Sequence, residues 1–234
     1  KSTTSARAFG AAEERVGRRG DFARHLRVLE RAAFDHSFST GDPPMSRVYL
    51  IRHAKPAQSF GQGDDEDPGL DDTGKAQAEA AAQALLALPE GDRPKRVVSS
   101  PLRRCRETAE PYAMAIGVEV EIYPFVGEIP TPKAYDAISR GPWLRKAFQG
   151  KWSEIEGDLD YDEWRREVAH AVAARGSAAV FSHYVAINAV FSTLADDDRV
   201  IVFRPDHASI SVFDRDEGQL SLVQPGREAN TSVM

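Results

Sequence analysis

The sequence contains a single cysteine, Cys105, so the chain cannot form an internal disulfide. It also lacks any run of about 18 apolar residues, the length that a membrane-spanning helix requires. The longest apolar stretches, Val48–Ile51 and Val185–Phe191, are short, and Asn188 interrupts the second. An excess of positive charge is missing too, since the net charge is −6, which argues against general nucleic-acid binding. We therefore expect a cytoplasmic protein with neither a membrane nor a nucleic-acid partner.

The sequence divides by composition into a short first part and a long second part. Residues 1–44 carry eight Lys and Arg against six Asp and Glu, a net charge of +2, which leaves −8 for the remainder. Asp21–Phe34 has the apolar spacing of one amphipathic helix, and Ser37–Pro44 is rich in turn-forming residues. We expect a partly helical N-terminal extension over residues 1–44 and one folded domain over residues 45–234.

Short apolar segments of strand length alternate with helical segments along this domain. The expected strands are Val48–Ile51, Arg96–Ser99, Val118–Tyr123 and Ala178–Phe181, the expected helices are Thr73–Leu88, one that opens at Ser100-Pro101, Tyr161–Ala174 and Tyr184–Leu194, and Ser209–Phe213 and Leu220–Val223 form a closing strand pair. This alternation predicts a three-layer α/β/α sandwich with a mostly parallel central sheet. In such sheets ligands bind at the carboxyl ends of the strands, which here carry Arg52-His53, Ser99-Ser100 and Ser182-His183.

The pair Arg52-His53 follows the first expected strand, whose backbone would hold both side chains rigidly. A neutral imidazole can attack phosphorus and form a covalent intermediate, which divides one difficult displacement into two easier steps. The adjacent guanidinium can bind phosphoryl oxygens in a bidentate manner. The dipeptide alone is a weak signal, because such pairs are more often structural.

Two further segments add candidate groups at strand ends. Ser100-Pro101 is expected to open a helix as its cap and first residue, a geometry suited to anions, and Arg104 and Thr108 share one face of that helix. Pro111 is expected to break or kink it. His183, after the fourth strand, would donate a hydrogen bond to a phosphoryl oxygen. Each group taken singly is as readily a structural residue.

The order of these segments resembles the histidine phosphatase superfamily, the phosphoglycerate mutase-like or RHG family, over about residues 47–215. Four segments carry the resemblance: Arg52-His53 with its signature, Leu70-Asp71-Asp72-Thr73-Gly74-Lys75-Ala76-Gln77-Ala78 with Leu-Thr-x-x-Gly-x-x-Gln-Ala, Ser100-Pro101-Leu102-Arg103-Arg104 and Thr108-Ala109 with Ser-Pro-Leu-x-Arg…Thr-Ala, and Ser182-His183 with its last motif. Ala54 and Tyr184 stand where the family commonly has glycine. The resemblance implies a phosphoglycerate mutase-like fold.

The resemblance also implies a role for each matching residue. His53 would be the phosphate acceptor, and Arg52, Arg104 and His183 would surround the phosphoryl group. The proton donor of the family is a carboxylate between the second and last of these motifs. Glu128, in a loop after the third expected strand, is the best match; Glu121 is its rival, but it lies within that strand, which should point it outward.

The expected activity is metal-independent hydrolysis of a phosphomonoester through a phosphohistidine on His53, with no cofactor and no metal ion. The substrate would be a small phosphorylated molecule or a phosphoprotein. Three alternatives stay open. They are phosphoryl transfer of the mutase type, although Lys55–Ser59 does not resemble the corresponding mutase segment, a protein phosphohistidine phosphatase, and a non-catalytic binding protein on the same fold. His207, near the closing strand pair, is interpreted as structural, with a contact at the rim of the site as the alternative. The sequence does not predict an oligomeric state.

Overall fold

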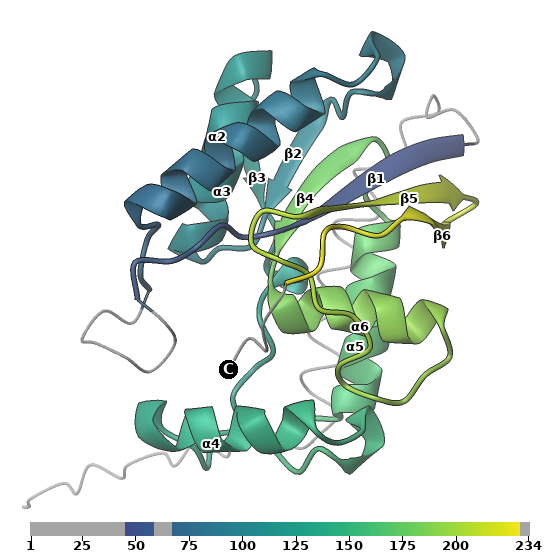
Figure 1. The fold of residues 1–234 in the computed structure, drawn as a ribbon. Helices are drawn as coiled ribbons and strands as arrows, with labels where there is room; N and C mark the ends of the chain where they lie inside the picture. Colours follow the sequence, from purple (N-terminus) through teal and green to yellow (C-terminus); the bar gives the residue numbers. More distant parts are fainter. Residues whose placement is uncertain (1–44, 59–66, 230–234) are drawn as a thin grey trace, which may run out of the picture. The chain divides into compact units, whose positions relative to one another are not determined.

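The structure is a computed structural model that describes residues 45–58 and 67–229. The expected N-terminal extension, with its helix Asp21–Phe34 and linker Ser37–Pro44, lies outside the described residues. In the described part of the chain, strands form one mixed sheet between layers of helices (Figure 1). The expected three-layer α/β fold is confirmed.

The sheet has the strand order β3-β2-β4-β1-β5-β6. Its strands are β1 (Met45–Arg52), β2 (Arg96–Ser99), β3 (Val120–Ile122), β4 (Ala178–Ser182), β5 (Ile210–Asp216) and β6 (Gln219–Gln224). The pairs β3-β2, β2-β4 and β4-β1 are parallel, whereas β1-β5 and β5-β6 are antiparallel. The sheet is therefore mostly parallel, and the expected closing strand pair is its antiparallel edge.

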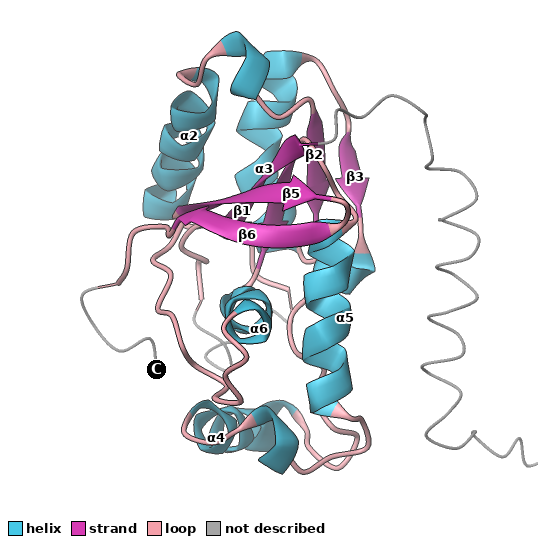
Figure 2. Ribbon diagram, turned by 90° about the vertical axis from the view of Figure 1, so that its right-hand side faces the viewer, coloured by secondary structure: helices cyan, strands magenta, loops and turns pink. Residues whose placement is uncertain are grey.

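Helices cover both faces of the sheet (Figure 2). They are α2 (Asp72–Leu86), α3 (Arg103–Ile116), α4 (Ala137–Phe148), α5 (Tyr161–Ala173) and α6 (Tyr184–Leu194), with short 3-10 turns at Glu90–Asp92, Pro124–Val126 and Trp152–Glu154. In both views α2 and α3 lie on one side of the sheet and α5 and α6 on the other, and α4 lies farther from the sheet on the side of α5 and α6.

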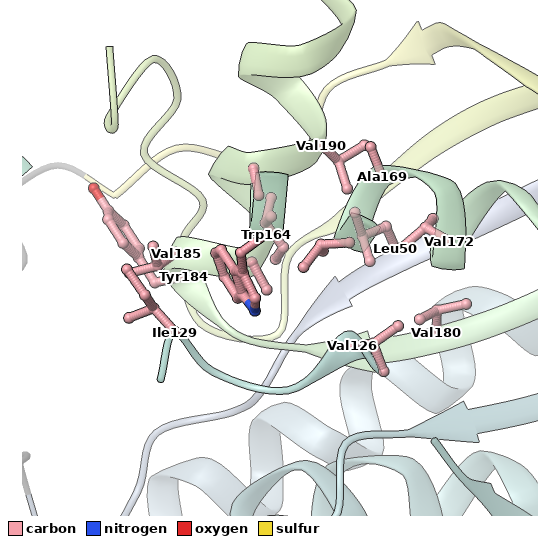
Figure 3. Packing of buried hydrophobic residues seen from close by; sticks show 14 of the residues in the cluster. Leu50, Val126, Ile129, Trp164, Ala169, Val172, Val180, Tyr184, Val185 and Val190 are labelled. Atoms are coloured by element: carbon pink, nitrogen blue, oxygen red, sulfur yellow. The ribbon is translucent and has the colours of Figure 1, made fainter. Parts of the chain in front are cut away.

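Side chains of the central strands point alternately into two apolar clusters. Val48 and Leu50 of β1 pack with residues of α5 and α6, whereas Tyr49 and Ile51 pack with residues of α2 and α3. Figure 3 shows part of the first cluster, with Leu50 among valines of the strands and helices. Burial on both faces explains why this strand is almost continuously apolar in the sequence.

Helix α3 departs from the expectation at two points. It begins at Arg103, with Leu102 at the N-cap position and no side-chain cap, so Ser100-Pro101 does not open it. Pro111 was expected to break or kink the helix, and it does not break it, because the helix continues to Ile116. Pro111 removes one backbone hydrogen bond, but buried side chains on both sides of it keep the helix packed against the sheet.

Candidate active site

The carboxyl ends of β1, β2 and β4 meet at one edge of the sheet. Strand β4 lies between the other two, and the register places Ser182 beside Arg52 and Phe181 beside Ser99. His53, the residue after β1, is also bonded to β4, because its amide donates to the Ser182 carbonyl (2.9 Å). The structure thus brings Arg52, His53 and His183 together across 130 residues of sequence.

The hydrogen bonds of His53 define which of its ring nitrogens carries the proton. Its Nδ1 lies 2.8 Å from the backbone oxygen of Ala54. Because a carbonyl oxygen can only accept, Nδ1 donates and Nε2 keeps its lone pair in the neutral ring. Burial lowers the pKa of His53 well below its usual value, and His183 and Arg52 lower it further. The site therefore holds a neutral imidazole with an unprotonated Nε2.

Arg52 is buried, with 4% of its surface exposed. Its Nη1 donates to the backbone oxygen of Pro205 (2.9 Å), whereas its buried Nε has no hydrogen-bond partner. Burial lowers the pKa of Arg52 to about 10, so the guanidinium is charged at neutral pH. A buried donor without a partner costs stability unless a ligand satisfies it, so the Nε–H of Arg52 could donate to an anionic ligand.

Arg104 lies in the first turn of α3 and contacts the second histidine. Its Nη2 lies 3.2 Å from Nδ1 of His183. A guanidinium can only donate, so this Nδ1 accepts and the proton of His183 is on Nε2. Burial lowers the pKa of His183 well below its usual value, and Arg104 and Arg52 lower it further. Two guanidinium groups therefore flank two neutral imidazoles, whose ring centroids are 5.3 Å apart.

Ser100 has a different role from the helix cap that its sequence context predicts. Its Oγ accepts a hydrogen bond from Nε2–H of His183 (2.7 Å). It also accepts one from the amide N–H of Leu102 (3.3 Å). Because Ser100-Pro101 remains non-helical, the hydroxyl reaches the ring of His183. This contact fixes the ring with Nδ1 of His183 directed toward Arg104.

The motif residues of α2 and α3 hold the backbone that follows His53. The Ala54 amide donates to Oγ1 of Thr108 (2.9 Å), and the Lys55 amide donates to Oε1 of Gln77 (2.9 Å). Gly74 allows α2 to approach this segment, because a Cβ there would lie 2.1 Å from the Lys55 carbonyl oxygen. These residues place no charge in the site, but they fix the backbone next to the imidazole.

Glu128 lies in the loop after Pro124–Val126, beside His183. Its Oε2 is 3.9 Å from Nδ1 of His183, and its Oε1 accepts the amide N–H of Ile129 (2.9 Å). The loop is fastened to the end of β4, because Oγ of Ser182 donates to the Val126 carbonyl (2.7 Å). Gly127 makes the turn possible, since a Cβ there would lie 2.8 Å from the carbonyl oxygen of Pro124.

The rival carboxylate, Glu121, lies away from this cluster. Its oxygens form ion pairs with Arg96 (2.6 Å) and Arg175 (3.5 Å), and its side chain is 40% exposed. Arg96 is the first residue of β2, at the opposite end of the strand from Ser99. The structure therefore places Glu128, and not Glu121, beside His183.

Two further residues lie near the site: His207, for which the sequence left a contact at the rim as the alternative to a structural role, and Arg140, which the sequence did not mark. The ring centroid of His207 is 5.6 Å from that of His53, and its Nδ1 donates to the His53 carbonyl (3.2 Å). Burial lowers its pKa to about 4.

Arg140 of α4 is buried, donates to Oγ1 of Thr131 (2.6 Å), and lowers the pKa of His183. No sequence signal marked Arg140, because α4 itself was not predicted.

Because His53 and His183 are buried as neutral rings, we expect the free energy of unfolding to depend on pH. The folded-state pKa values of His53 and His183 lie well below the usual value near 6.5. Below about pH 6.5 the unfolded chain therefore binds protons that the folded chain does not, and stability falls as the pH falls. We expect a loss of about 2–4 kcal/mol between pH 6.5 and 5, measured by urea unfolding.

A matched variant isolates this effect. His170 is exposed on α5, so His170→Gln should keep the same pH dependence, whereas His53→Gln should reduce its slope. A free energy of unfolding that is constant between pH 6.5 and 5 would contradict the assignment of neutral buried rings.

Two structural absences apply to residues 45–58 and 67–229. No group of three or more His, Cys, Asp or Glu side chains in this part of the chain is arranged to hold a metal ion. No helix in the same residues is long and apolar enough to cross a membrane.

The site thus combines two histidines and two arginines at the carboxyl ends of the parallel strands of an α/β protein. The model of the histidine phosphatase superfamily (branch 1) matches residues 48–227. The chain belongs to this superfamily, and the resemblance seen in its motifs is confirmed. No curated protein matches the sequence significantly.

Solved structures share the fold at low sequence identity. A mycobacterial glucosyl-3-phosphoglycerate phosphatase is 20% identical, with a TM-score of 0.57, and the match covers 77% of this chain and 98% of that one. A phosphoserine phosphatase from Entamoeba histolytica, in complex with 3-phosphoglyceric acid, is 19% identical, with a TM-score of 0.61 and coverage of 79% and 98%. A putative alpha-ribazole-5'-P phosphatase from Escherichia coli is 18% identical, with a TM-score of 0.59 and coverage of 79% and 97%.

Proposed function

We propose that this protein hydrolyses phosphomonoesters through a phosphohistidine on His53. The observation that carries the proposal is the hydrogen bond from Nδ1 of His53 to the Ala54 carbonyl, which leaves Nε2 unprotonated beside two buried guanidiniums. In the first step Nε2 attacks phosphorus, the ester P–O bond breaks, and the leaving alkoxide takes a proton from the carboxyl group of Glu128.

The second step returns the site to its starting state. Water attacks the phosphohistidine, the P–N bond breaks, and Glu128 accepts a proton from the water, so inorganic phosphate leaves and Nε2 of His53 regains its lone pair. The same carboxyl group acts first as an acid and then as a base. Its position beside His183, with an Oε2 to Nδ1 distance of 3.9 Å, supports this assignment.

The surrounding charges would stabilise the transferring group. Arg52 and Arg104 would bind the phosphoryl oxygens, and His183 would become a donor through Nδ1 once a bound anion raises its pKa. These groups supply positive charge without a metal ion. The solved relatives include phosphatases of small phosphorylated molecules, and hydrolysis of such a molecule, or of a phosphoprotein, is the corresponding proposal for this chain.

The activity is tested with p-nitrophenyl phosphate in the presence of EDTA. We expect phosphate release to continue in the chelator, and acid-labile, base-stable phosphate to remain on the protein after rapid denaturation, because the intermediate is a phosphoramidate on His53. Loss of activity in EDTA would indicate a metal-dependent enzyme. No turnover at any pH would favour the binding protein, and phosphate transferred to a second position of the substrate would favour the mutase.

A further inference from the structure

An aromatic ring lies against the guanidinium of Arg52. The Cζ atom of Arg52 is 5.0 Å from the ring centroid of Tyr184, within the range of a cation–π interaction. The family commonly has a glycine at this position, where this chain has the aromatic ring. It is 7% exposed, and a contact of this kind is stronger when it is shielded from water.

The backbone that carries the ring is held in place. Tyr184 is the first residue of α6, and its carbonyl accepts from Nδ2 of Asn188 (2.9 Å). Oδ1 of Asn188 accepts the amides of Val202 and Phe203, both at 2.9 Å, so this side chain joins α6 to the following loop. Asn188, which interrupts the apolar stretch in the sequence, therefore fixes the start of the helix next to Arg52.

The ring itself is supported on another side by α4. Its centroid is 5.9 Å from that of Phe148, the last residue of that helix. In Figure 3 the Tyr184 side chain lies at the border of the apolar cluster, near Ile129, with its hydroxyl directed away from the other labelled side chains. The ring of Tyr184 is thus packed between Arg52 and Phe148.

The other contacts of Arg52 add to the effect of the Tyr184 ring on the orientation of the guanidinium. Nη1 is bound to the Pro205 carbonyl, and the buried Nε has no partner. With one amino group anchored and the ring of Tyr184 beside the guanidinium, the plane of the guanidinium has little freedom to turn. The edge formed by Nε and Nη2 then keeps one direction, and such an edge matches two oxygens of a phosphoryl group.

We propose that Tyr184 is a positioning residue that holds Arg52 in the orientation that binds phosphate. The inference rests on the proposed function and deepens it, because it names the contact that prepares the phosphate site before substrate arrives. An ordinary core residue at this position would contribute bulk alone. The two roles differ in one measurable respect: the positioning role requires an aromatic ring, whereas bulk can be supplied by an aliphatic side chain.

The test compares binding of inorganic phosphate by isothermal titration calorimetry among variants of the full chain. Tyr184→Phe keeps the ring and should bind phosphate within about twofold of the original protein. Tyr184→Leu should weaken binding by roughly three- to thirty-fold, the range of a partly shielded cation–π contact. Tyr184→Met provides a second non-aromatic variant with the same expected loss, in case leucine impairs folding.

Phe213→Leu is the matched control. Phe213 belongs to the same apolar cluster and packs edge-on against Phe191, with ring centroids 5.6 Å apart, so its replacement also removes a buried ring. It should lower the melting temperature without changing phosphate affinity. The Tyr184→Leu variant should also lose kcat/KM for p-nitrophenyl phosphate by a factor similar to its loss of phosphate affinity, because Arg52 would contact the phosphoryl group throughout the reaction.

Three results would overturn the inference. Unchanged phosphate affinity in both non-aromatic variants, with an active original protein, would refute positioning by Tyr184 and leave the proposed function intact. An equal loss in Tyr184→Phe would assign the effect to the hydroxyl rather than to the ring. An original protein that neither binds phosphate nor hydrolyses the ester would instead refute the proposed function, and the inference with it.

Discussion

Replacing His53 with alanine is expected to lower kcat for p-nitrophenyl phosphate by about four to six orders of magnitude, the size of loss seen when a covalent nucleophile is removed. The variant has no Nε2 to attack phosphorus, so hydrolysis would require direct attack by water. Phosphate should still bind, because Arg52 and Arg104 are unchanged. The measurements are initial rates of nitrophenol release and calorimetric titration with inorganic phosphate.

A control on another histidine shows whether the loss is specific. His170→Ala changes an exposed residue of α5 and should keep the rate of the original protein. Circular dichroism should show that His53→Ala remains folded. The His53 ring is neutral in the folded protein, so its removal leaves no buried charge without a partner. Unimpaired turnover by His53→Ala would exclude the phosphohistidine mechanism.

The elements that were predicted best are those with a simple local pattern. Tyr184–Leu194 has the bounds that the sequence indicates, and Ala178–Phe181 falls one residue short of β4. Both are largely apolar segments that the structure buries. Their lengths, 5 residues for the strand and 11 for the helix, separate the two assignments without long-range information.

Helix α4 was missed because its sequence contains helix-breaking residues. Gly141 and Pro142 lie inside it, and each lowers the intrinsic preference for a helix. The structure compensates with a capping box at Asp136 and Ser139 and with Trp143, which is 5% exposed. Those tertiary contacts outweigh the local preference, and a pattern in the sequence alone does not contain them.

The candidate site residues at the strand ends were predictable from the sequence, whereas the residues that support them were not. Arg52 and His183 lie at strand ends, where topology alone gathers side chains. The hydroxyl of Ser100 on Nε2 of His183, and the ring of Tyr184 beside Arg52, depend on contacts across 83 and 132 residues. Such contacts arise from the packed fold rather than from the spacing of residues in a motif.

Replacing Glu128 with glutamine should separate the two steps of the proposed reaction. The amide cannot supply a proton to the leaving alkoxide, so kcat for an alkyl phosphate such as glycerol 2-phosphate should fall by about 10²–10⁴-fold. Nitrophenolate is a much better leaving group and departs without a proton, so the first step with p-nitrophenyl phosphate should remain fast. Loss of the base should then slow hydrolysis of the phosphohistidine.

The expected result for Glu128→Gln is therefore a burst of nitrophenol followed by slow turnover, with phosphate accumulating on His53, and no burst with the alkyl phosphate. Rapid-quench kinetics with both substrates measures this difference. Glu121→Gln is the matched control, because its partners Arg96 and Arg175 lie outside the histidine cluster, and it should turn over both substrates at the original rate. If Glu121→Gln gave the burst and Glu128→Gln kept the original rate, Glu121 would be the acid. If Glu128→Gln lost activity equally on both substrates without a burst, Glu128 would orient the phosphoryl group instead of moving protons.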